Sequence, residues 1–122
     1  MRAKYKTIGI KSIEETLSEA GEVMGAISRG EDVKPKAPAF YFTSFEAFRR
    51  AMTPQRYALL KAIREHAPDS VQALARIVER DIKNVSEDLK ALAEMDLVEM
   101  ERHGKAKSPR VRYQGIRIEL GV

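Results

Sequence analysis

Five basic side chains and a histidine lie within eleven consecutive positions near the C-terminal end, with no Asp or Glu among them. Guanidinium and ammonium groups gathered in this way create a local positive field that favours phosphate. Gly104 and Pro109 interrupt the segment and indicate a turn between two strands. The chemistry that this pattern favours is binding of a polyanion. The side chains concerned are Arg102, His103, Lys105, Lys107, Arg110 and Arg112.

A second polar group belongs to a helix that the spacing predicts from an Asp81 N-cap to about Glu94. One side of this helix is polar, which suits the major groove of DNA, where Asn can bond adenine and Lys can reach guanine or phosphate. Its serine suits a phosphate contact, and its glutamate can accept a cytosine amino proton or pair with a lysine. For the helix alone, a solvated charged face is the alternative. The polar residues are Lys83, Asn84, Ser86, Glu87 and Lys90.

The opposite side of this helix is apolar and is predicted to pack inward against two preceding helices. Thr53-Pro54 is a start signal for the first of these, which runs to about Glu65. Ser70 caps the second, and its place at the helix N-terminus also makes it a candidate phosphate contact. The residues expected to face the core are Tyr57, Leu60, Ala62, Ile63, Val71, Leu74, Ala75, Val78, Ile82, Val85, Leu89 and Leu92.

Two strands are predicted after the third helix, Leu97 to Met100 and Arg110 to Tyr113, with a loop tip from His103 to Ser108. Three helices with a tight connection before the third, followed by a hairpin, form a winged helix-turn-helix. The fold class is therefore α+β, and residues 43–122 form the expected DNA-binding domain. In such a domain one duplex lies against both the third helix and the basic hairpin.

Residues 1–42 are an appendage that a minimal winged helix does not need. A strand is predicted from Lys4 to Ile10 and a helix from Ser12 to Ser28, where Ser12 and Glu15 have capping-box spacing. The apolar residues of that helix recur at intervals of three and four. They are Ile13, Leu17, Ala20, Met24 and Ile27.

The appendage is joined to the domain by Gly30 to Pro38, a polar stretch with two prolines that is typical of a linker. An extended segment is predicted from Ala39 to Phe42, and Thr43 and Glu46 have the spacing of a second capping box. At the other end of the chain, alternating apolar residues from Ile116 to Leu120 predict a last strand.

Other chemistries find little support. The chain has 122 residues, no Cys and two His, so Cys-based metal sites and disulfides are excluded. His66 and His103 have no ligand partner at metal spacing, and Gly104-Lys105 lacks the upstream Gly of a phosphate-binding loop. We expect no enzyme activity, no metal and no cofactor. The N-terminus lacks the apolar core of a signal peptide, and no apolar run could span a bilayer, so we expect a cytoplasmic protein without a membrane partner.

The segment MTPQRYALLKAIREHAPDSVQALARIVERDIKNVSEDLKALAEMDLVEMERHGKAKSPRVRY resembles the MarR- and ArsR-like winged helix-turn-helix regulators of prokaryotes. Three segments look more narrowly like a family of small transcriptional regulators, some of them antitoxin-like: TSFEAFRRAMTPQRYALLKAIRE, RDIKNVSEDLKALAEMDLVE and YQGIRIEL. Met95-Asp96 departs from the pattern, because many relatives have Gly at that helix end. The resemblance implies a homodimeric double-stranded DNA-binding regulator of the cytoplasm.

Two roles remain open for residues 1–42. They could join two copies of the chain, since winged-helix regulators read two half-sites through two-fold symmetry. They could instead bind and mask a toxin-like partner protein, which would make the chain an antitoxin-like interaction module.

Overall fold

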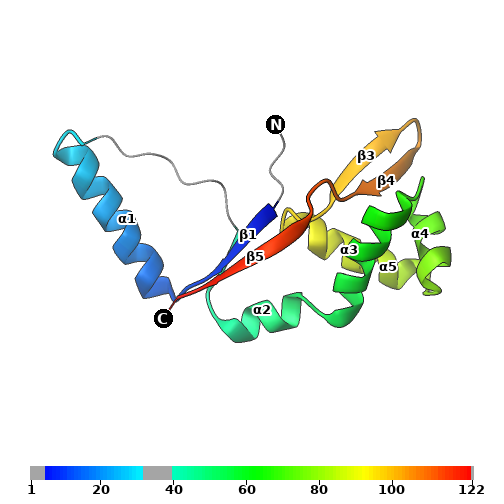
Figure 1. Cartoon of the computed structure of the whole chain (residues 1–122), viewed down its shortest axis with the longest axis horizontal. Helices are drawn as coiled ribbons and strands as arrows, with labels where there is room; N and C mark the ends of the chain where they lie inside the picture. Colours follow the sequence, from blue (N-terminus) through cyan, green and yellow to red (C-terminus); the bar gives the residue numbers. More distant parts are fainter. Residues whose placement is uncertain (1–4, 32–39, 122) are drawn as a thin grey trace.

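The computed structural model describes residues 5–31 and 40–121. Within them, five helices and five strands form a mixed α+β protein, as predicted (Figure 1). In chain order the elements are β1 Tyr5–Ile10, α1 Ile13–Ser28, β2 Phe40–Phe42, α2 Phe45–Ala51, α3 Pro54–His66, α4 Val71–Val78, α5 Ile82–Glu94, β3 Glu99–His103, β4 Ala106–Arg110 and β5 Gly115–Leu120.

Helices α3, α4 and α5 pack together around an apolar core. Leu59 and Ile63 of α3, Leu74 of α4, and Val85 and Leu92 of α5 are almost completely buried. Leu89 and Ala75 are also buried, as predicted. Two other residues that were predicted to face the core do not. Tyr57 and Ile82 lie at the ends of their apolar stripes and remain about half exposed, and Leu59 takes the inward position on α3.

The predicted caps hold these three helices in place. The side chains of Thr53, Ser70 and Asp81 accept hydrogen bonds from backbone N–H groups in the first turns of α3, α4 and α5. The cap of α2 differs from its prediction. Ser44, rather than Thr43, accepts from the Ala47 N–H at 3.1 Å, because α2 begins one residue later than the capping-box spacing suggested.

The end of α5 turns the chain sharply into β3. Asp96 has a φ of 60°, a left-handed conformation that Gly adopts most readily and that Asp tolerates better than most residues. The Leu97 N–H then donates to the Leu92 carbonyl at 2.9 Å, closing the helix end. Leu97 and Val98 are buried against the helices, so they belong to the core before the hairpin begins.

Strands β3 and β4 form an antiparallel hairpin whose position along the chain corrects the prediction. The first strand starts two residues later than Leu97, and the second runs over 106–110 rather than 110–113. A tight turn at Gly104-Lys105 explains the shift, because Gly104 has a φ of 61°, which a two-residue hairpin turn needs at its first central position. Pro109, expected to end the loop, instead lies within β4 opposite Met100.

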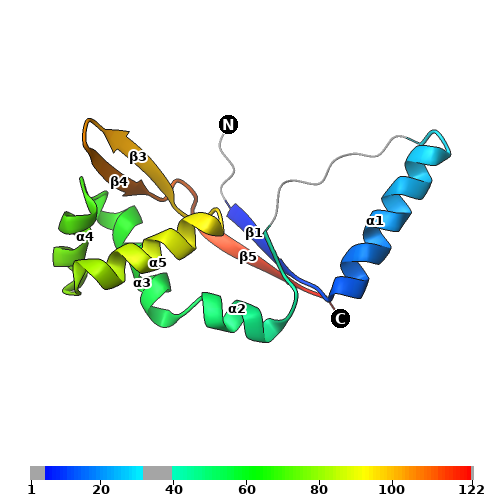
Figure 2. The ribbon, with the colours of Figure 1, turned by 180° about the vertical axis from the view of Figure 1, so that it is seen from behind.

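The other three strands form a parallel sheet in the order β2-β1-β5. Ile8 of β1 lies between Phe40 of β2 and Ile118 of β5 in this sheet. The predicted strands near both ends of the chain are therefore confirmed over β1 and β5, which lie side by side, while Lys4 lies outside the described residues (Figure 2). The expected boundary between residues 42 and 43 runs through this sheet, since β5 follows the three helices in sequence yet pairs with β1.

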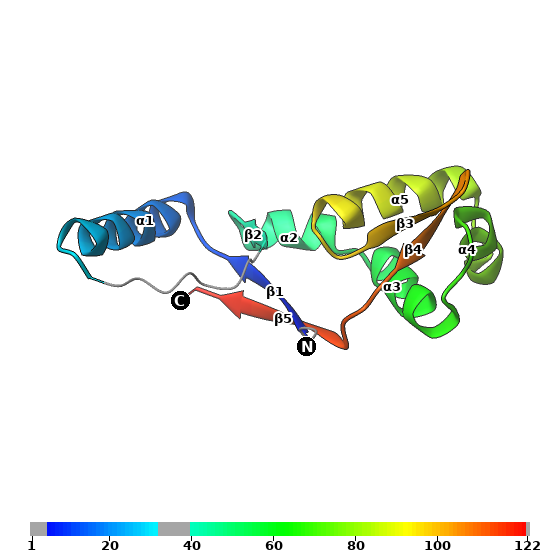
Figure 3. The same cartoon turned by 90° about the horizontal axis from the view of Figure 1, so that it is seen from above.

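Helix α1 begins with the predicted capping box between Ser12 and Glu15. It projects from the end of the sheet, on the far side from α3, α4 and α5 (Figure 3). Leu17 and Met24 of this helix face solvent, with 66% and 69% of their surface exposed. Most of the predicted linker, residues 32–38, lies outside the described residues. Within those residues, no helix combines the length and apolar character needed to cross a membrane.

Candidate functional site

A groove of about 370 Å³ lies between α5, the start of α4 and the hairpin. Its apolar lining comes from all three elements, and three polar side chains complete it: Ser86 and Lys90 from α5 and Lys107 from β4. Residues from the predicted helix and the predicted basic hairpin therefore border one surface depression. The apolar part of the lining is Val71, Leu89, Ala93 and Met100.

The outward side of α5 carries the polar residues that the helical spacing predicted. Lys83, Asn84, Ser86, Glu87 and Lys90 are all exposed. Their side chains make no hydrogen bond or ion pair within the part of the chain that the structure describes. Val85 and Leu89 on the opposite side are buried, so the helix is held against the core while its polar side stays accessible.

The two faces of the β3–β4 hairpin differ in charge balance. Arg102 lies opposite Lys107, and Met100 lies opposite Pro109, so the strand alternation places these four residues on one face. Met100 and Lys107 border the groove, which identifies this face as the one beside α5. Arg102, Lys105 and Lys107 are exposed and form no ion pair among the described residues.

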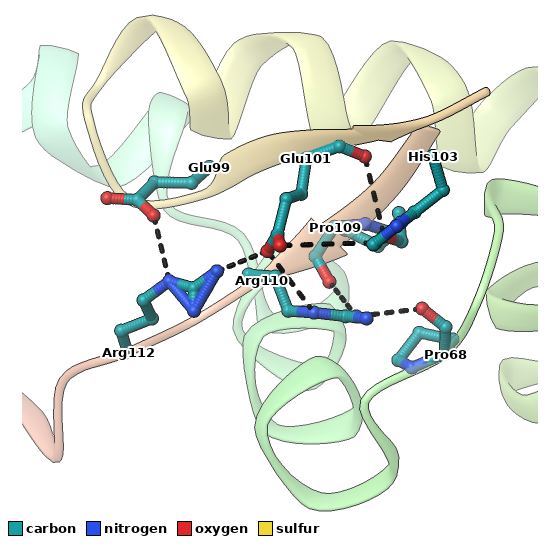
Figure 4. A network of polar contacts seen from close by, with 8 residues as sticks. Pro68, Glu99, Glu101, His103, Pro109, Arg110 and Arg112 are labelled. Carbon is teal, nitrogen blue, oxygen red and sulfur yellow. Dashed lines mark hydrogen bonds and ion pairs between the residues drawn. The ribbon is translucent and has the colours of Figure 1, made fainter. Parts of the chain in front are cut away.

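The remaining arginines of the basic segment are already engaged by the protein (Figure 4). Arg112 pairs with Glu99 at 3.1 Å and also contacts Glu101. Arg110 lies 3.7 Å from Glu101 and donates to the Pro68 carbonyl at 2.9 Å, which ties the hairpin to the connection before α4. Arg110 and Arg112, which were predicted to contact DNA, thus have structural partners.

Glu101 is the carboxylate at the centre of this network. The hydrogen bond from Arg112 lowers the pKa of the Glu101 carboxyl below its ordinary value, against the opposing effect of burial. The His103 Nε2 lies 4.0 Å from Glu101 Oε1, an ion pair only when the imidazole is protonated. Glu101 therefore stays ionised and neutralises part of the hairpin's positive charge.

A second network fixes α5 relative to the other helices. Asp88 accepts hydrogen bonds from Arg56 at 3.0 Å and from Arg80 at 2.8 Å. Arg56 also donates to the Ala51 carbonyl at 2.8 Å. Burial acts to raise the pKa of Asp88, but the hydrogen bonds from Arg80 and Arg56 outweigh it and hold that pKa below its usual value. One side chain of α5 is thereby bonded to both α3 and the connection after α4.

Ser70 has a defined structural role at the N-terminus of α4. Its hydroxyl oxygen accepts from the Ala73 N–H at 3.0 Å, and the residue is only partly exposed. The hydroxyl can still donate to a phosphate oxygen, because a single O–H group is both donor and acceptor.

Sequence reasoning missed the residues that engage the basic side chains. Asp88 was unassigned, although it lies on the same side of α5 as the buried residues, where an unpaired carboxylate would be costly. Glu99 and Glu101 lie just before the acid-free segment, and only the hairpin register brings them beside Arg110 and Arg112. A correct strand assignment would have shown this proximity.

A smaller cavity of about 210 Å³ lies between the sheet and the hairpin. Charged residues line it, but Lys6 pairs with Asp96 at 2.8 Å and Arg112 with Glu99, so its opposite charges already satisfy one another. Among residues 5–31 and 40–121, no group of three or more His, Cys, Asp or Glu side chains is placed to hold a metal ion.

The fold and the groove define a small α+β protein with a helix and a basic hairpin side by side. The chain matches the HVO_A0114 family model over residues 51–118, more than half its length, and it belongs to that family. The match covers all of α3, α4, α5 and the hairpin. A comparison with curated proteins finds no match.

Proposed function

We propose that the protein is a winged helix-turn-helix transcriptional regulator that binds double-stranded DNA as a homodimer in the cytoplasm. In this proposal α5 enters the major groove, and the β3–β4 hairpin is the wing that reaches the adjacent backbone or minor groove. The single observation that carries it is the shared groove, which Ser86 and Lys90 of α5 border together with Lys107 of the hairpin.

The division of the basic residues supports this orientation. Arg56, Arg80, Arg110 and Arg112 are engaged by carboxylates. The basic side chains on the α5 and hairpin surface make no such pair within the described residues, so they are available to displace the counterions around DNA. These available cations are Lys83, Lys90, Arg102, Lys105 and Lys107.

Base recognition is assigned to the N-terminal half of α5. Asn84 is exposed there and can form the bidentate contact to adenine, while Lys83 can reach guanine or phosphate. Glu87 lies between the lysines on the outward side and is assigned either to a cytosine amino group or to pairing with Lys83 or Lys90 once DNA is bound. Asp88 and the buried apolar side hold the helix in place during this contact.

Selection of bound duplexes from a random pool tests the proposal directly. We expect an enriched motif with two-fold symmetry and half-sites separated by about one helical turn of DNA. Binding should weaken steeply as salt rises, because phosphate contacts release condensed counterions. Recovery of no motif, together with equal affinity for all duplexes, would reject sequence-specific regulation.

The exposed apolar side of α1 favours a second candidate, an antitoxin-like module that masks a partner protein. Leu17, Met24 and Ile27 are each at least 60% exposed, as expected of a helix that binds another polypeptide. A copurifying partner that protects these residues, in the absence of any selected DNA motif, would favour this alternative.

A further inference from the structure

Helix α1 presents an apolar stripe that residues 5–31 and 40–121 leave exposed. Leu17, Ala20, Met24 and Ile27 follow one another at intervals of three, four and three, which is the spacing of a coiled-coil seam. All four are exposed, and the three large ones are 60–69% exposed. In coiled coils, a seam with this spacing buries its apolar surface against a second helix.

The start of α1 is anchored so that the helix points away from the sheet. Lys11 Nζ donates to Glu19 at 2.6 Å, and the Lys11 N–H donates to the Phe42 carbonyl at 3.0 Å. The Lys11 side chain is only 11% exposed. These bonds join the first two turns of α1 to the end of the sheet, so folding the helix back onto its own sheet would break them. The helix projects away from the sheet (Figures 1 and 3).

We propose that α1 pairs antiparallel with α1 of a second copy of this chain, about a two-fold axis near Glu22. In this register Leu17 lies against Ile27 of the second copy, and Ala20 lies against Met24 of the second copy. Each contact occurs twice, as an isologous interface requires. The small Ala20 faces the long Met24, so the layers fill space without a clash.

The carboxylates of α1 lie away from the proposed contact. The helix contains four Glu residues and no Lys or Arg. Glu15, Glu19 and Glu22 fall on the side opposite the stripe, and Glu14 flanks it near the N-terminal end, far from the axis. Gly21 and Val23 are the residues that flank the seam at the axis. Two acidic helices can therefore approach without placing carboxylates opposite one another.

This pairing rests on the proposed function, because it supplies the two-fold axis of the DNA-binding dimer. The small area that two α1 helices can bury limits the stability of the dimer. A helix of 16 residues is about 24 Å long, so one pair of such helices buries less than the roughly 800 Å² per partner of a standard interface. We expect a dimer that dissociates on dilution and that DNA with two half-sites stabilises.

Cysteine cross-linking of the full chain tests the geometry, because the natural chain has no Cys. Val23→Cys places a thiol beside the axis, and Glu22→Cys is the matched control on the outer side of the helix. With a short bismaleimide and without DNA, we expect covalent dimers of Val23→Cys to form at least ten times faster than those of Glu22→Cys. Equal rates, or no covalent dimer from either variant, would overturn the proposed register.

Sedimentation over a concentration series supplies an independent measurement. Met24→Glu should raise the dimer dissociation constant at least tenfold, whereas Glu22→Gln should leave it unchanged. Thermal unfolding of Met24→Glu should match the natural chain, since Met24 is already exposed. A natural chain that stays monomeric at every concentration, because α1 closes on its own sheet or awaits another protein, would overturn the proposal. So would a Met24→Glu variant that dimerises normally.

The same preparations separate this inference from the proposed function. A cross-linked dimer that binds no duplex would reject DNA regulation and leave the helix pairing standing. A monomer that still binds a single half-site duplex would reject the pairing and leave DNA binding standing.

Discussion

Arg80 Nη2 donates a hydrogen bond to Asp88 Oδ2 at 2.8 Å, joining the connection before α5 to the middle of that helix. Arg56 reaches the other oxygen of the same carboxylate. Asp88→Asn should destabilise the fold by about 1–3 kcal/mol, because it removes a charged acceptor and leaves two arginines poorly paired. Thermal denaturation should show a fall in Tm of about 4 °C for each kcal/mol in a chain of 122 residues. Glu87→Gln, on the exposed side of α5, is the matched control.

The effect of Asp88→Asn should depend on pH. The pKa of Asp88 is lowered below 3.8 in the folded protein, so its ion pairs stabilise the fold above that pH and lose their effect as pH falls through the folded pKa. The difference in Tm between the two proteins should therefore be largest near neutral pH and shrink in acid below 3.8. A difference that grows on acidification would contradict the role given to this carboxylate.

Much of the fold could be predicted because its signals are local. Thr53, Ser70 and Asp81 each carry a capping oxygen at the start of a helix, and the structure places all three at those positions. The polar side of α5 followed from helical spacing in the same way. The parallel pairing of β1 with β5 had no local signal, because residues 5–10 and 115–120 meet only after the helices fold.

The sequence did not show which side chains of the basic segment are paired with carboxylates. Its residue types indicate phosphate binding, but only the strand register separates Lys107 from the neutralised Arg110 and Arg112. That register depends on the turn at Gly104, and the predicted loop was too long. A shift of the strands by a few residues therefore changed which cations are available for a ligand.

Tyr113 supports the junction between the helices and the sheet. Its hydroxyl donates to the Leu97 carbonyl at 2.6 Å, and the side chain is 7% exposed. Tyr113→Phe should destabilise the fold by about 1–3 kcal/mol, because the carbonyl loses its partner in a buried site. Tyr57→Phe, at an exposed position, should leave Tm within about 2 °C of the natural value.

Tyr113 should also make the stability of the fold depend on pH in the alkaline range. Burial raises the pKa of this phenol well above 10.0, with a further contribution from the charge of Asp96. The folded state therefore keeps a proton that the unfolded state releases, and stability should fall as pH rises above 10.0. Tyr113→Phe should show a weaker decline over the same range. An equal decline in both proteins would assign the alkaline sensitivity to other groups.

Lys107 should contribute to duplex affinity without contributing to base preference. Lys107→Ala should weaken binding to all duplexes alike and reduce the slope of log affinity against log salt by about one unit. The matched control is Arg117→Ala, which removes the same charge from β5, where Arg117 lies 4.5 Å from the Tyr5 ring. Equal losses in the two variants would indicate a general charge effect and reject a specific phosphate contact by the hairpin.

Glu101→Gln should act in the opposite direction to Lys107→Ala. Removing the carboxylate leaves Arg112 with Glu99 as its remaining acidic partner and raises the local positive potential. We expect tighter binding to any duplex and a steeper salt dependence, measured by fluorescence anisotropy over a salt series. Glu119→Gln in β5 makes the same charge change away from the hairpin. Unchanged affinity in Glu101→Gln would place the wing outside the contact region.

Asn84 should determine sequence preference. It is exposed on α5 and uncharged, so its loss should leave the salt slope unaltered while removing a bidentate bond to one base. Asn84→Ala should reduce discrimination at one base pair in each half-site by about 1–3 kcal/mol, measured with duplexes that carry each substitution in turn. Gln114→Ala, an exposed amide before β5, should preserve every preference. If Asn84→Ala weakens binding to all duplexes equally, Asn84 contacts the DNA backbone. Lys83 or Lys90 would then make the base-specific contact.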